Sequence, residues 1–303
     1  MQTSSHILMI RPVNFGFNAE TAVNNLFQVK SDQTSAQDNA VQEFDNLVST
    51  LRKNEIEVTV VQDTPEPYTP DSIFPNNWIS FLEDGTIFLF PMFAQNRRAE
   101  RKESVLEVVN EKFIINNRVD LTGYESQNLF LEGTGSMVLD RDHKIAYACL
   151  SQRTDKMILA DFCKRTGYTP ISFTAVDAGN QPIYHTNVMM CVADAFVVIC
   201  LDCIPEPGEK ELVISSILAS GKKIIEISQE QMEHFAGNML QLENRKGEKL
   251  LVMSSQAYQS LTEKQITDLT QFNRLIHSDI STIETNGGGS ARCMIAEVFL
   301  PVR

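Results

Sequence analysis

The stretch from 136 to 173, SMVLDRDHKIAYACLSQRTDKMILADFCKRTGYTPISF, contains one complete unit of the expected fold. Two apolar segments, Ser136–Leu139 and Lys144–Cys149, are joined by a short charged turn, which favours a hairpin. Helical apolar spacing then runs from Asp155 to Arg165 and ends near a glycine, the usual residue just after a helix. The apolar segment Thr169–Phe173 follows, so the stretch predicts a strand–strand–helix–strand unit.

The same order recurs about five times, at a spacing of roughly 50–60 residues, which is typical of a repeat architecture. The other helices are expected around Val41–Leu51, at Arg98–Lys112, at Gly208–Ser220 and after Thr262, and the strands after them at Glu57–Val61, Phe113–Ile115, Lys223–Ile227 and Arg274–His277. The remaining extended pairs are Ile79–Leu82 with Thr86–Phe90, Val188–Val192 with Phe196–Leu201, and Met239–Glu243 with Leu250–Met253. Such units favour a closed circular array.

The two ends of the chain supply the segments that would close this array. The last apolar segment, Met294–Leu300, is expected to pair with the first, Ile7–Ile10. No linker or low-complexity stretch interrupts the chain, so we expect one domain over residues 1–303.

Composition excludes several classes of function. The chain has 303 residues, 43% of them apolar, and a net charge of -13. This balance argues against nucleic acid or an anionic membrane as a partner, since both require clustered Lys and Arg. The N-terminus lacks the pattern of a signal peptide and no segment reaches the roughly 20 apolar residues of a membrane span, so a cytoplasmic location is expected.

The six cysteines predict neither a metal site nor a disulfide framework. Only Cys200 and Cys203 form a C-x-x-C pair, and no second pair or suitably spaced histidines accompany it. Most of the others lie in apolar runs, as buried thiols do in a reducing compartment. We therefore expect no metal and no cofactor.

One cysteine is an exception. Cys293 lies in the segment Asn286-Gly287-Gly288-Gly289-Ser290-Ala291-Arg292-Cys293-Met294. Three consecutive glycines allow the backbone to approach a ligand closely, so a thiol after them is well placed to act as a nucleophile. The alternative is a flexible turn before a strand that buries the thiol.

Three further segments contain side chains suited to a polar site. His185 precedes an apolar strand, where loops build sites, and Glu132 lies between an apolar pair and two glycines. A carboxylate there could orient a histidine that serves a nucleophile. The segment Pro70–Trp78 is rich in Asp and Asn, whose side chains need partners when buried. A structural histidine, a capped turn and a proline-rich loop are the alternative interpretations.

Taken in order, these motifs resemble those of the guanidine-modifying (pentein) superfamily. Gly-Gly-Gly-Ser-Ala-Arg-Cys-Met at 287–294 is similar to the ending of arginine deiminases, and Pro70-Asp71-Ser72-Ile73-Phe74 is similar to a stretch of dimethylarginine dimethylaminohydrolases. Leu131-Glu132-Gly133, Ser151-Gln152-Arg153-Thr154 and the His185 segment occur in the same order as in those enzymes. The resemblance covers nearly the full length and implies a five-bladed, pseudo-symmetric α/β-propeller of ββαβ units.

The resemblance also implies a role for each matching residue. Cys293 would be the nucleophile, His185 the general acid and base, and Glu132 the carboxylate that holds His185. Asp71 would bind the terminal nitrogens of a small amino-acid substrate. The substrate α-carboxylate would be bound by Arg153 together with Arg97 or Arg98, two neighbours between which the sequence does not choose.

The chain departs from the family at two positions. Where arginine deiminases have acidic residues, this chain has Asn77 and Asn187. An amide keeps hydrogen-bonding capacity but lacks the charge that would balance a guanidinium, so a neutral ureido group is favoured. The chain therefore most resembles a citrulline-utilisation hydrolase, which would convert citrulline and water to ornithine, carbon dioxide and ammonia.

Several alternatives stay open. They are an arginine deiminase or a dimethylarginine-type hydrolase, an amidinotransferase, and a non-catalytic propeller that binds a partner. With a neutral substrate, the thiolate of Cys293 is expected to depend on protonated His185 and on backbone dipoles. The segment from Arg11 to Asn25, rich in asparagine, is a candidate lid. The oligomeric state is open, with a homodimer among the alternatives.

Overall fold

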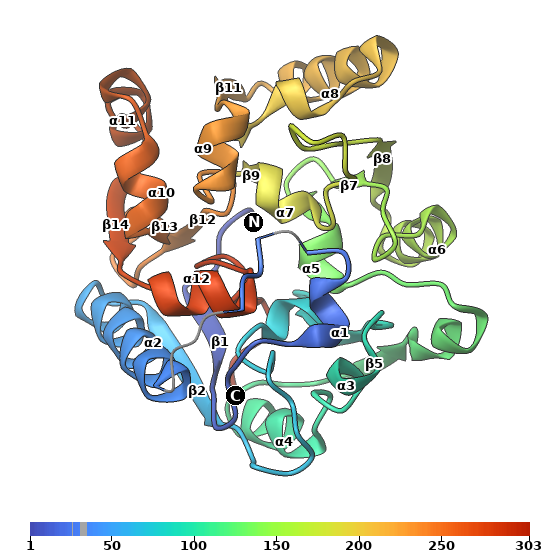
Figure 1. The fold of residues 1–303 in the computed structure, drawn as a ribbon, viewed down its shortest axis with the longest axis vertical. Coiled ribbons are helices and arrows are strands. Elements are labelled where there is room, and N and C mark those ends of the chain that lie inside the picture. The colour runs from blue at the N-terminus through green and yellow to red at the C-terminus, as the bar shows by residue number, and fades with distance from the viewer. Residues whose placement is uncertain (26, 31–34) are drawn as a thin grey trace.

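Five three-stranded sheets are arranged around a common centre in the computed structural model of this chain, which describes residues 1–25, 27–30 and 35–303 (Figure 1). In every sheet the middle strand pairs antiparallel with one neighbour and parallel with the other. The sheets, in pairing order, are β15 (Ala296–Val298), β1 (His6–Arg11) and β2 (Glu57–Gln62); β3 (Ile79–Phe81), β4 (Thr86–Leu89) and β5 (Asn117–Asp120); β6 (Val138–Asp140), β7 (Ile145–Cys149) and β8 (Thr169–Phe173); β9 (Met190–Val192), β10 (Phe196–Ile199) and β11 (Lys223–Glu226); and β12 (Leu240–Glu243), β13 (Lys249–Ser254) and β14 (Arg274–Ser278). The predicted propeller of ββαβ units is confirmed.

A helix connects the two parallel strands of each sheet and lies on the outside of the ring (Figure 1). These helices are α2 (Ala36–Lys53), α4 (Glu103–Lys112), α6 (Lys156–Thr166), α8 (Pro207–Ala219) and α11 (Glu263–Thr270). Parallel strands require such a crossover, since a tight hairpin cannot join them. In α2, Phe44, Leu47 and Leu51 are fully buried, so its apolar face packs inward as its periodicity predicts.

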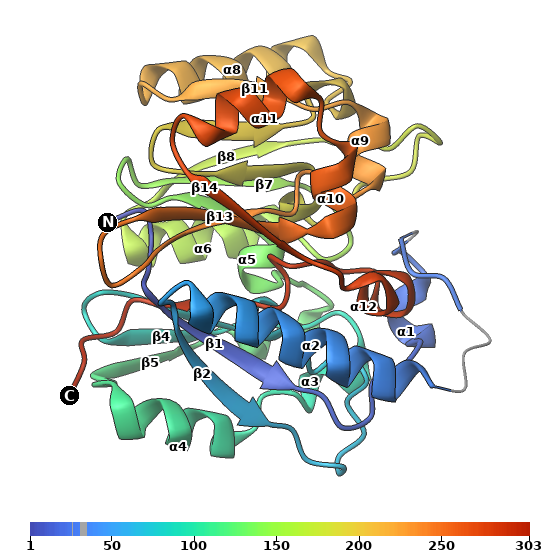
Figure 2. The ribbon, with the colours of Figure 1, turned by 90° about the vertical axis from the view of Figure 1, so that its left-hand side faces the viewer.

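Shorter helices fill the connections. They are α1 (Ala19–Ala22), η1 (Pro75–Asn77), α3 (Gln95–Arg98), η2 (Thr122–Gln127), α5 (Gly133–Ser136), α7 (Thr186–Met189), η3 (Leu201–Cys203), α9 (Gln229–Glu233), α10 (Ser255–Ser260) and α12 (Ser281–Gly287). Several of them lie on the face of the ring that carries α1, whereas both chain ends lie on the opposite side (Figure 2).

Local signals set the limits of the helices. The Asp155 side chain accepts hydrogen bonds from the first turn of α6, and Gly167 ends that helix with a φ of 76°. Thr262 caps α11 through a capping box with Gln265. Both ends agree with the sequence, because capping residues satisfy backbone groups that the helix itself leaves free.

The ring closes as predicted, through the first and last strands. β1 pairs with β15 in antiparallel register, with His6 opposite Val298 and Leu8 opposite Ala296. The last strand is shorter than expected, since the residues around Met294 form turns.

Two predictions around the second sheet are wrong. The segment Phe113–Ile115 is not a strand: Phe113 forms an isolated bridge with Val302, and the strand is β5, at Asn117–Asp120. β5 lies at a sheet edge and is largely exposed, so it lacks an apolar signal. The helix expected at Arg98–Lys112 is divided into α3 and α4.

Two strand beginnings are also wrong. Ser136 belongs to α5, and Val188 and Met189 belong to α7, so β6 and β9 begin later than predicted. Both short helices are fully buried, and the apolar residues Val188 and Met189 of α7 resemble the start of a buried strand. Their position at the centre of the ring is what places the functional side chains.

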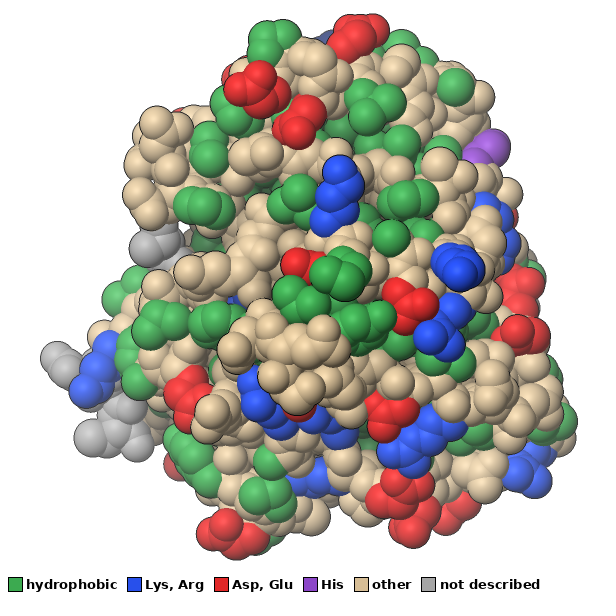
Figure 3. Space-filling model, turned by 90° about the vertical axis from the view of Figure 1, so that its right-hand side faces the viewer, with side chains coloured by type: hydrophobic (Ala, Val, Ile, Leu, Met, Phe, Trp, Pro, Cys, Tyr) green, Lys and Arg blue, Asp and Glu red, His purple; other side chains and the backbone are tan. Residues whose placement is uncertain are grey.

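The chain has an excess of acidic residues. On the side drawn in Figure 3, acidic, basic and apolar side chains are interspersed and no large acidic patch is seen among the described residues. In the described part of the chain, no helix is long and apolar enough to cross a membrane.

Candidate active site

Each of the five sheets contributes one residue to the centre of the ring, just before its first strand. These residues are Asn77, Ser136, Asn187, Asn238 and Cys293. Three of them end or lie in the short helices η1, α5 and α7, which turn the chain from the loop into the strand. The fivefold repeat therefore brings side chains that are far apart in sequence to one place.

Cys293 is buried, and its sulfur contacts two of these side chains, Asn187 and Asn238. Its Sγ accepts hydrogen bonds from Asn187 Nδ2 at 3.4 Å and from Asn238 Nδ2 at 3.3 Å. The Asn238 side chain is itself fixed, because its Nδ2 also donates to Asn187 O and its Oδ1 accepts from Arg292 N. Two neutral N–H donors thus point at the sulfur, and such donors favour the thiolate over the thiol.

Sequence reasoning missed Asn238. Its signal lies in the repeat: Asn238 lies two residues before β12, and Cys293 lies three residues before β15. Aligning the units on their first strands would have placed Asn238 beside the nucleophile candidate.

His185 and Glu132 form a buried pair. His185 Nε2 lies 2.8 Å from Glu132 Oε2, and Phe93 N donates to Glu132 Oε1 at 2.9 Å. Burial alone would raise the pKa of Glu132, but Arg153, His185 and Arg97 lower it to about 2. Glu132 is therefore ionised, and it fixes the imidazole as the tautomer with its proton on Nε2. The other ring nitrogen, Nδ1, is left as a proton acceptor.

Burial lowers the pKa of His185 to about 4; the Glu132 carboxylate opposes this shift, and the guanidinium groups of Arg153 and Arg97 add to it. The imidazole is thus neutral near pH 7. The expectation that a protonated His185 sustains the thiolate is wrong for this arrangement. The amide donors of Asn187 and Asn238 occupy that place at the sulfur.

Asp71 presents an unpaired oxygen. Asn18 Nδ2 donates to Asp71 Oδ2 at 2.7 Å and Thr21 Oγ1 donates to the same atom at 3.1 Å, while Oδ1 is buried without a hydrogen-bond partner. Burial raises the pKa of Asp71, against the effect of Arg97, whose Nε lies 3.9 Å away. A buried oxygen of this kind calls for a donor, which a bound ligand could supply.

The structure separates the two neighbouring arginines. Arg97 is buried, forms a two-pronged ion pair with Glu100 at 2.8 and 2.9 Å, and donates to Asn77 Oδ1 at 2.8 Å. Arg98 points elsewhere, toward Met92 O and the Glu125 carboxylate. Of the pair left open by the sequence, only Arg97 lies in the site.

Arg153 joins the site to the segment predicted as a lid. Its guanidinium lies 3.6 Å from Glu132 and 5.0 Å from the ring centre of Tyr184. It donates to Thr21 O at 2.7 Å and, through Nε, to Asn24 Oδ1 at 2.9 Å. The segment around α1, residues 18–25, therefore lies across the site, and we call it the strap.

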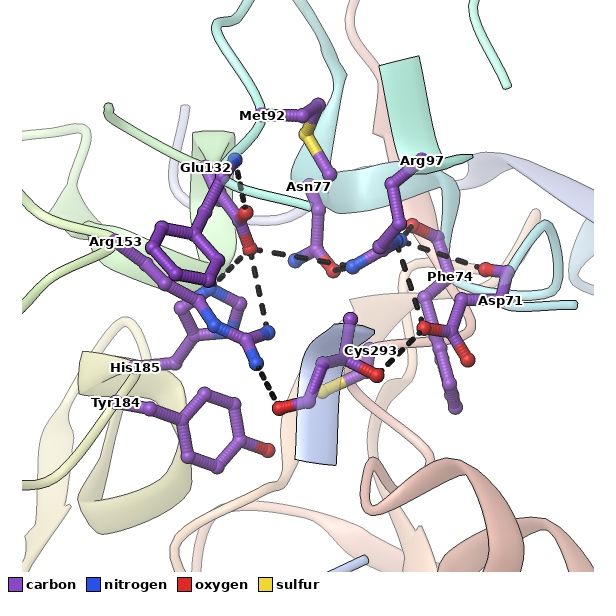
Figure 4. A network of polar contacts seen from close by, with 12 residues as sticks. Asp71, Phe74, Asn77, Met92, Arg97, Glu132, Arg153, Tyr184, His185 and Cys293 are labelled. Atoms are coloured by element: carbon purple, nitrogen blue, oxygen red, sulfur yellow. Dashed lines mark hydrogen bonds and ion pairs between the residues drawn. The ribbon is translucent and has the colours of Figure 1, made fainter. Parts of the chain in front are cut away.

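Figure 4 shows these groups around one small cavity, with Glu132 between His185 and Arg153, and Arg97 between Asn77 and Asp71. The cavity is lined by Thr21, Asn25, Asp71, Phe74, Asn77, Arg97, Arg153, Tyr184, His185, Gly287, Gly288, Gly289 and Cys293. The structure thus brings together every predicted site residue except Arg98, with Glu132 and Asn187 behind the lining. Among the described residues, no cluster of His, Cys, Asp and Glu is arranged to hold a metal ion.

Five such sheets around a shared polar site define a pentein, as the predicted superfamily requires. The chain belongs to the family described as "N,N dimethylarginine dimethylhydrolase, eukaryotic", whose model matches residues 11–300. The predicted class of enzyme, a hydrolase that acts on non-peptide carbon–nitrogen bonds, is that of this family. No curated protein matched the chain.

Solved structures support the fold. ArgZ, an arginine dihydrolase from the ornithine-ammonia cycle in Cyanobacteria, aligns with a TM-score of 0.78 and 18% identity over 98% of this chain and 41% of that one. Its N-terminal domain alone, bound to substrate, aligns with a TM-score of 0.76 at 18% identity over 97% of this chain and 99% of that domain. A dimethylarginine dimethylaminohydrolase adduct aligns with a TM-score of 0.66 and 17% identity over 97% and 99% of the two chains. This chain thus spans less than half of full-length ArgZ.

Proposed function

We propose that this protein is a cysteine hydrolase that cleaves the ureido carbon–nitrogen bonds of citrulline. The observation that carries the proposal is the set of uncharged amides around Cys293, with Asn187 and Asn238 on the sulfur and Asn77 close by. Family membership supports an arginine-related substrate, and the amides narrow it to a neutral reacting group.

The proposed reaction begins at the sulfur. Cys293 Sγ bonds to the ureido carbon, and neutral His185 takes the thiol proton. The tetrahedral intermediate collapses as the bond to the terminal nitrogen breaks, and His185 returns its proton so that ammonia leaves. The chain and the rest of the substrate are then linked by a thiocarbamate.

Water completes the reaction. His185 accepts a proton from the water, whose oxygen bonds to the thiocarbamate carbon. The carbon–sulfur bond breaks, and His185 returns this proton to Cys293 Sγ, which restores the thiol and the neutral imidazole. The released carbamate decomposes to ornithine and carbon dioxide, so that one citrulline and one water yield ornithine, carbon dioxide and ammonia. Glu132 takes no proton in this scheme, because its pKa of about 2 keeps it ionised; it holds the His185 ring and its charge.

Charge explains the choice of substrate. Among the described residues, Asp71 is the one carboxylate that lines the cavity, and Arg97 and Arg153 line it too. A guanidinium in this cavity would face Asp71, which the Arg97 guanidinium already approaches at 3.9 Å, whereas a ureido group needs only donors and acceptors. The unpartnered Oδ1 of Asp71, which lines the cavity, supplies an acceptor for a ureido N–H group.

The α-carboxylate of the substrate would bind Arg153. In this structure Arg153 holds Thr21 O and Asn24 Oδ1 of the strap, so binding exchanges these contacts for a charge-assisted pair. Arg97 is less available, because Glu100 already takes two of its donors.

A substrate screen tests the proposal. Purified protein is incubated with citrulline, arginine and methylated arginines, and ornithine, citrulline and ammonia are measured. Ornithine and ammonia are expected in equal amounts from citrulline, with at least tenfold lower turnover of arginine. Cys293→Ser is the inactive control. Accumulation of citrulline from arginine would overturn the substrate, and full activity of Cys293→Ser would overturn the mechanism.

An arginine dihydrolase is the second candidate, favoured by the likeness to ArgZ and by the buried carboxylate of Asp71. Asparagine-to-aspartate variants separate the two candidates. For a citrulline enzyme, Asn187→Asp should lower citrulline turnover, because it puts a like charge beside the reacting sulfur, and should improve arginine relative to citrulline. For an arginine enzyme, the wild type itself should release two ammonia molecules per ornithine.

A further inference from the structure

A second cavity lies on the far side of the ring from the strap, where both chain ends are found (Figure 2). Its volume is about 580 Å³, and its walls include three cationic side chains, Arg141, Lys144 and Arg165, with the rings of Tyr168 and Phe299. None of these residues belongs to the active site. A basic hollow is unexpected in a chain with a net charge of -13, so its purpose needs an explanation.

Arg141 is a buried cation that lacks a full counter-charge. Only 8% of its side chain is exposed, and its guanidinium lies 4.0 Å from the centre of the Phe299 ring. In the described part of the chain its one ion-paired carboxylate is Glu297, whose Oε2 lies 3.5 Å away and also accepts from the Arg292 guanidinium at 3.0 Å. Two buried guanidinium groups therefore share one carboxylate, and an excess positive charge is left at the cavity.

The other cations add to this excess. Lys144 Nζ lies 4.8 Å from the centre of the Tyr168 ring, and no carboxylate among the described residues forms an ion pair with it. Arg165 pairs at 2.9 Å with Asp161, a surface pair that leaves most of its donors free.

Acidic groups on the cavity wall do not cancel the cations. The lining holds two carboxylates, Glu83, which binds the N-terminal ammonium at 3.1 Å, and Asp84, whose Oδ1 accepts from Thr86 N at 2.9 Å. Three cationic side chains and the N-terminal ammonium, four positive groups, thus face these two carboxylates. The cationic groups, by contrast, offer unused donors. The cavity thus presents donors and positive charge to whatever enters it.

We propose that this cavity binds a small organic anion through a phosphate or carboxylate group. The anionic group would bind the Arg141 guanidinium and replace the carboxylate of Glu297, which Arg141 shares with Arg292. Lys144 and Arg165 line the same cavity. A guanidinium matches the paired oxygens of either group, and the neighbouring rings accommodate an apolar body. The cavity is too small and too isolated a basic feature for a nucleic acid, which requires an extended basic surface.

Titration calorimetry tests the site with two probes, inorganic phosphate and citrate, against sodium chloride at matched ionic strength. Saturable binding of one anion per chain is expected for at least one probe. Arg141→Gln should weaken it by about tenfold or more, the effect of losing one charge-assisted pair. Binding of phosphate alone indicates a phosphate ester as the natural ligand, and binding of citrate alone indicates a carboxylate.

Three further variants keep the test sharp. Lys144→Asn with Arg165→Gln changes two exposed side chains, suits the positive φ of 54° at residue 144, and should weaken binding several-fold in a folded protein. Lys164→Gln, an exposed neighbour on α6 outside the cavity, and Arg153→Gln in the active site should both leave binding unchanged. Absence of saturable binding to either probe, or equal affinity in Arg141→Gln and the wild type, would overturn the proposal.

Discussion

At the scale of single residues, the environment divides identical side chains into different roles. Six buried acidic and basic groups lie within or next to the site: Asp71, Arg97, Glu100, Glu132, Arg153 and His185. Arginine and histidine neighbours lower the pKa of Glu132 to about 2 despite its burial, whereas burial raises the pKa of Glu100 to about 7, in spite of the ion pair with Arg97. Burial lowers the pKa of His185 to about 4. A carboxylate that stays ionised beside a neutral imidazole is the pairing that a general base requires.

The pKa of His185 predicts how stability changes with pH. An unfolded histidine binds a proton near pH 6.5, but the folded one resists protonation down to about pH 4, so the unfolded state holds more protons in this window. The contribution of His185 is fully present above pH 6.5 and is lost as the pH falls toward 4. The contribution of His185 to the free energy of unfolding should fall by roughly 2–3 kcal/mol over this pH range.

Urea unfolding of the wild type and of His185→Gln between pH 7.5 and 4.5 measures this effect. The difference between the two proteins isolates His185 from Glu100 and Glu284, whose raised pKa values of about 7 act in the opposite direction. A pH-independent difference would contradict the prediction.

Asn238 gives a second prediction at this scale. Its side chain donates to Cys293 Sγ and is held by Arg292 N. Asn238→Ala should slow alkylation of Cys293 by iodoacetamide at pH 7 about five- to tenfold, because one hydrogen bond to the thiolate is worth about 1–1.4 kcal/mol. Asn46→Ala, on the exposed face of α2, is the control. Mass spectrometry of the alkylated peptide gives the rate, and an unchanged rate would remove Asn238 from the site.

At the scale of elements, the short helix α5 shows how the site is built. Gly135 lies against two side chains from other elements: a Cβ at this position would be 2.4 Å from Asn77 Nδ2 and 2.8 Å from His185 Nδ1. No side chain fits between them. The glycine is therefore needed for the helix to bring His185 and Asn77 together.

Gly135→Ala should displace His185 or Asn77 and reduce kcat/KM at least tenfold, since a shift of about 1 Å in a catalytic group has effects of this size. The free energy of unfolding should fall by about 1–3 kcal/mol. Gly123→Ala in η2 is the matched control, because a Cβ there meets nothing within 4 Å. Steady-state kinetics and urea unfolding of both variants give the comparison, and equal kinetics in the two would be inconsistent with this role.

The elements also show which parts of the structure a sequence can reveal. The outer helices were predictable, because their buried faces have a regular apolar spacing and their ends carry capping residues such as Asp155. β5 was not, since an exposed edge strand has no apolar pattern. Ser136 of α5 and Val188 and Met189 of α7 were predicted as the starts of strands, because both short helices are buried.

The site was predictable where a motif carried it. Cys293, His185 and Glu132 stand in recognisable segments, and the structure places them around one cavity or directly behind it. Asn238 has no motif of its own, and the choice of Arg97 over Arg98 depends on how α3 is oriented, which no local pattern records.

At the scale of the whole molecule, β1 is the strand that completes the ring, because it pairs with β15 on one side and β2 on the other. Leu8 in this strand is fully buried and belongs to the same apolar cluster as Trp78 and Val298. The closure was predictable from the apolar segments at the two ends, since a repeat array of this kind has no other partner for them.

Leu8→Ala should therefore lower the free energy of unfolding by about 2–5 kcal/mol, through loss of buried surface and the cavity left behind. Leu218→Ala, on the exposed face of α8, removes the same atoms from the surface and should change it by less than about 0.5 kcal/mol. Unfolding is followed by circular dichroism and by the fluorescence of Trp78, the one tryptophan of the chain. Equal decreases in the free energy of unfolding of the two variants would contradict a stabilising role for the β1 strand that closes the ring.

The five pre-strand residues Asn77, Ser136, Asn187, Asn238 and Cys293 have one more consequence. Each is supplied by a different sheet, and each sheet has its own strand pairing. Each of these positions can therefore be substituted on its own without altering the strand pairing of the other sheets. A combinatorial library at the four positions other than Cys293 would show which amides and hydroxyls decide between a ureido and a guanidino substrate.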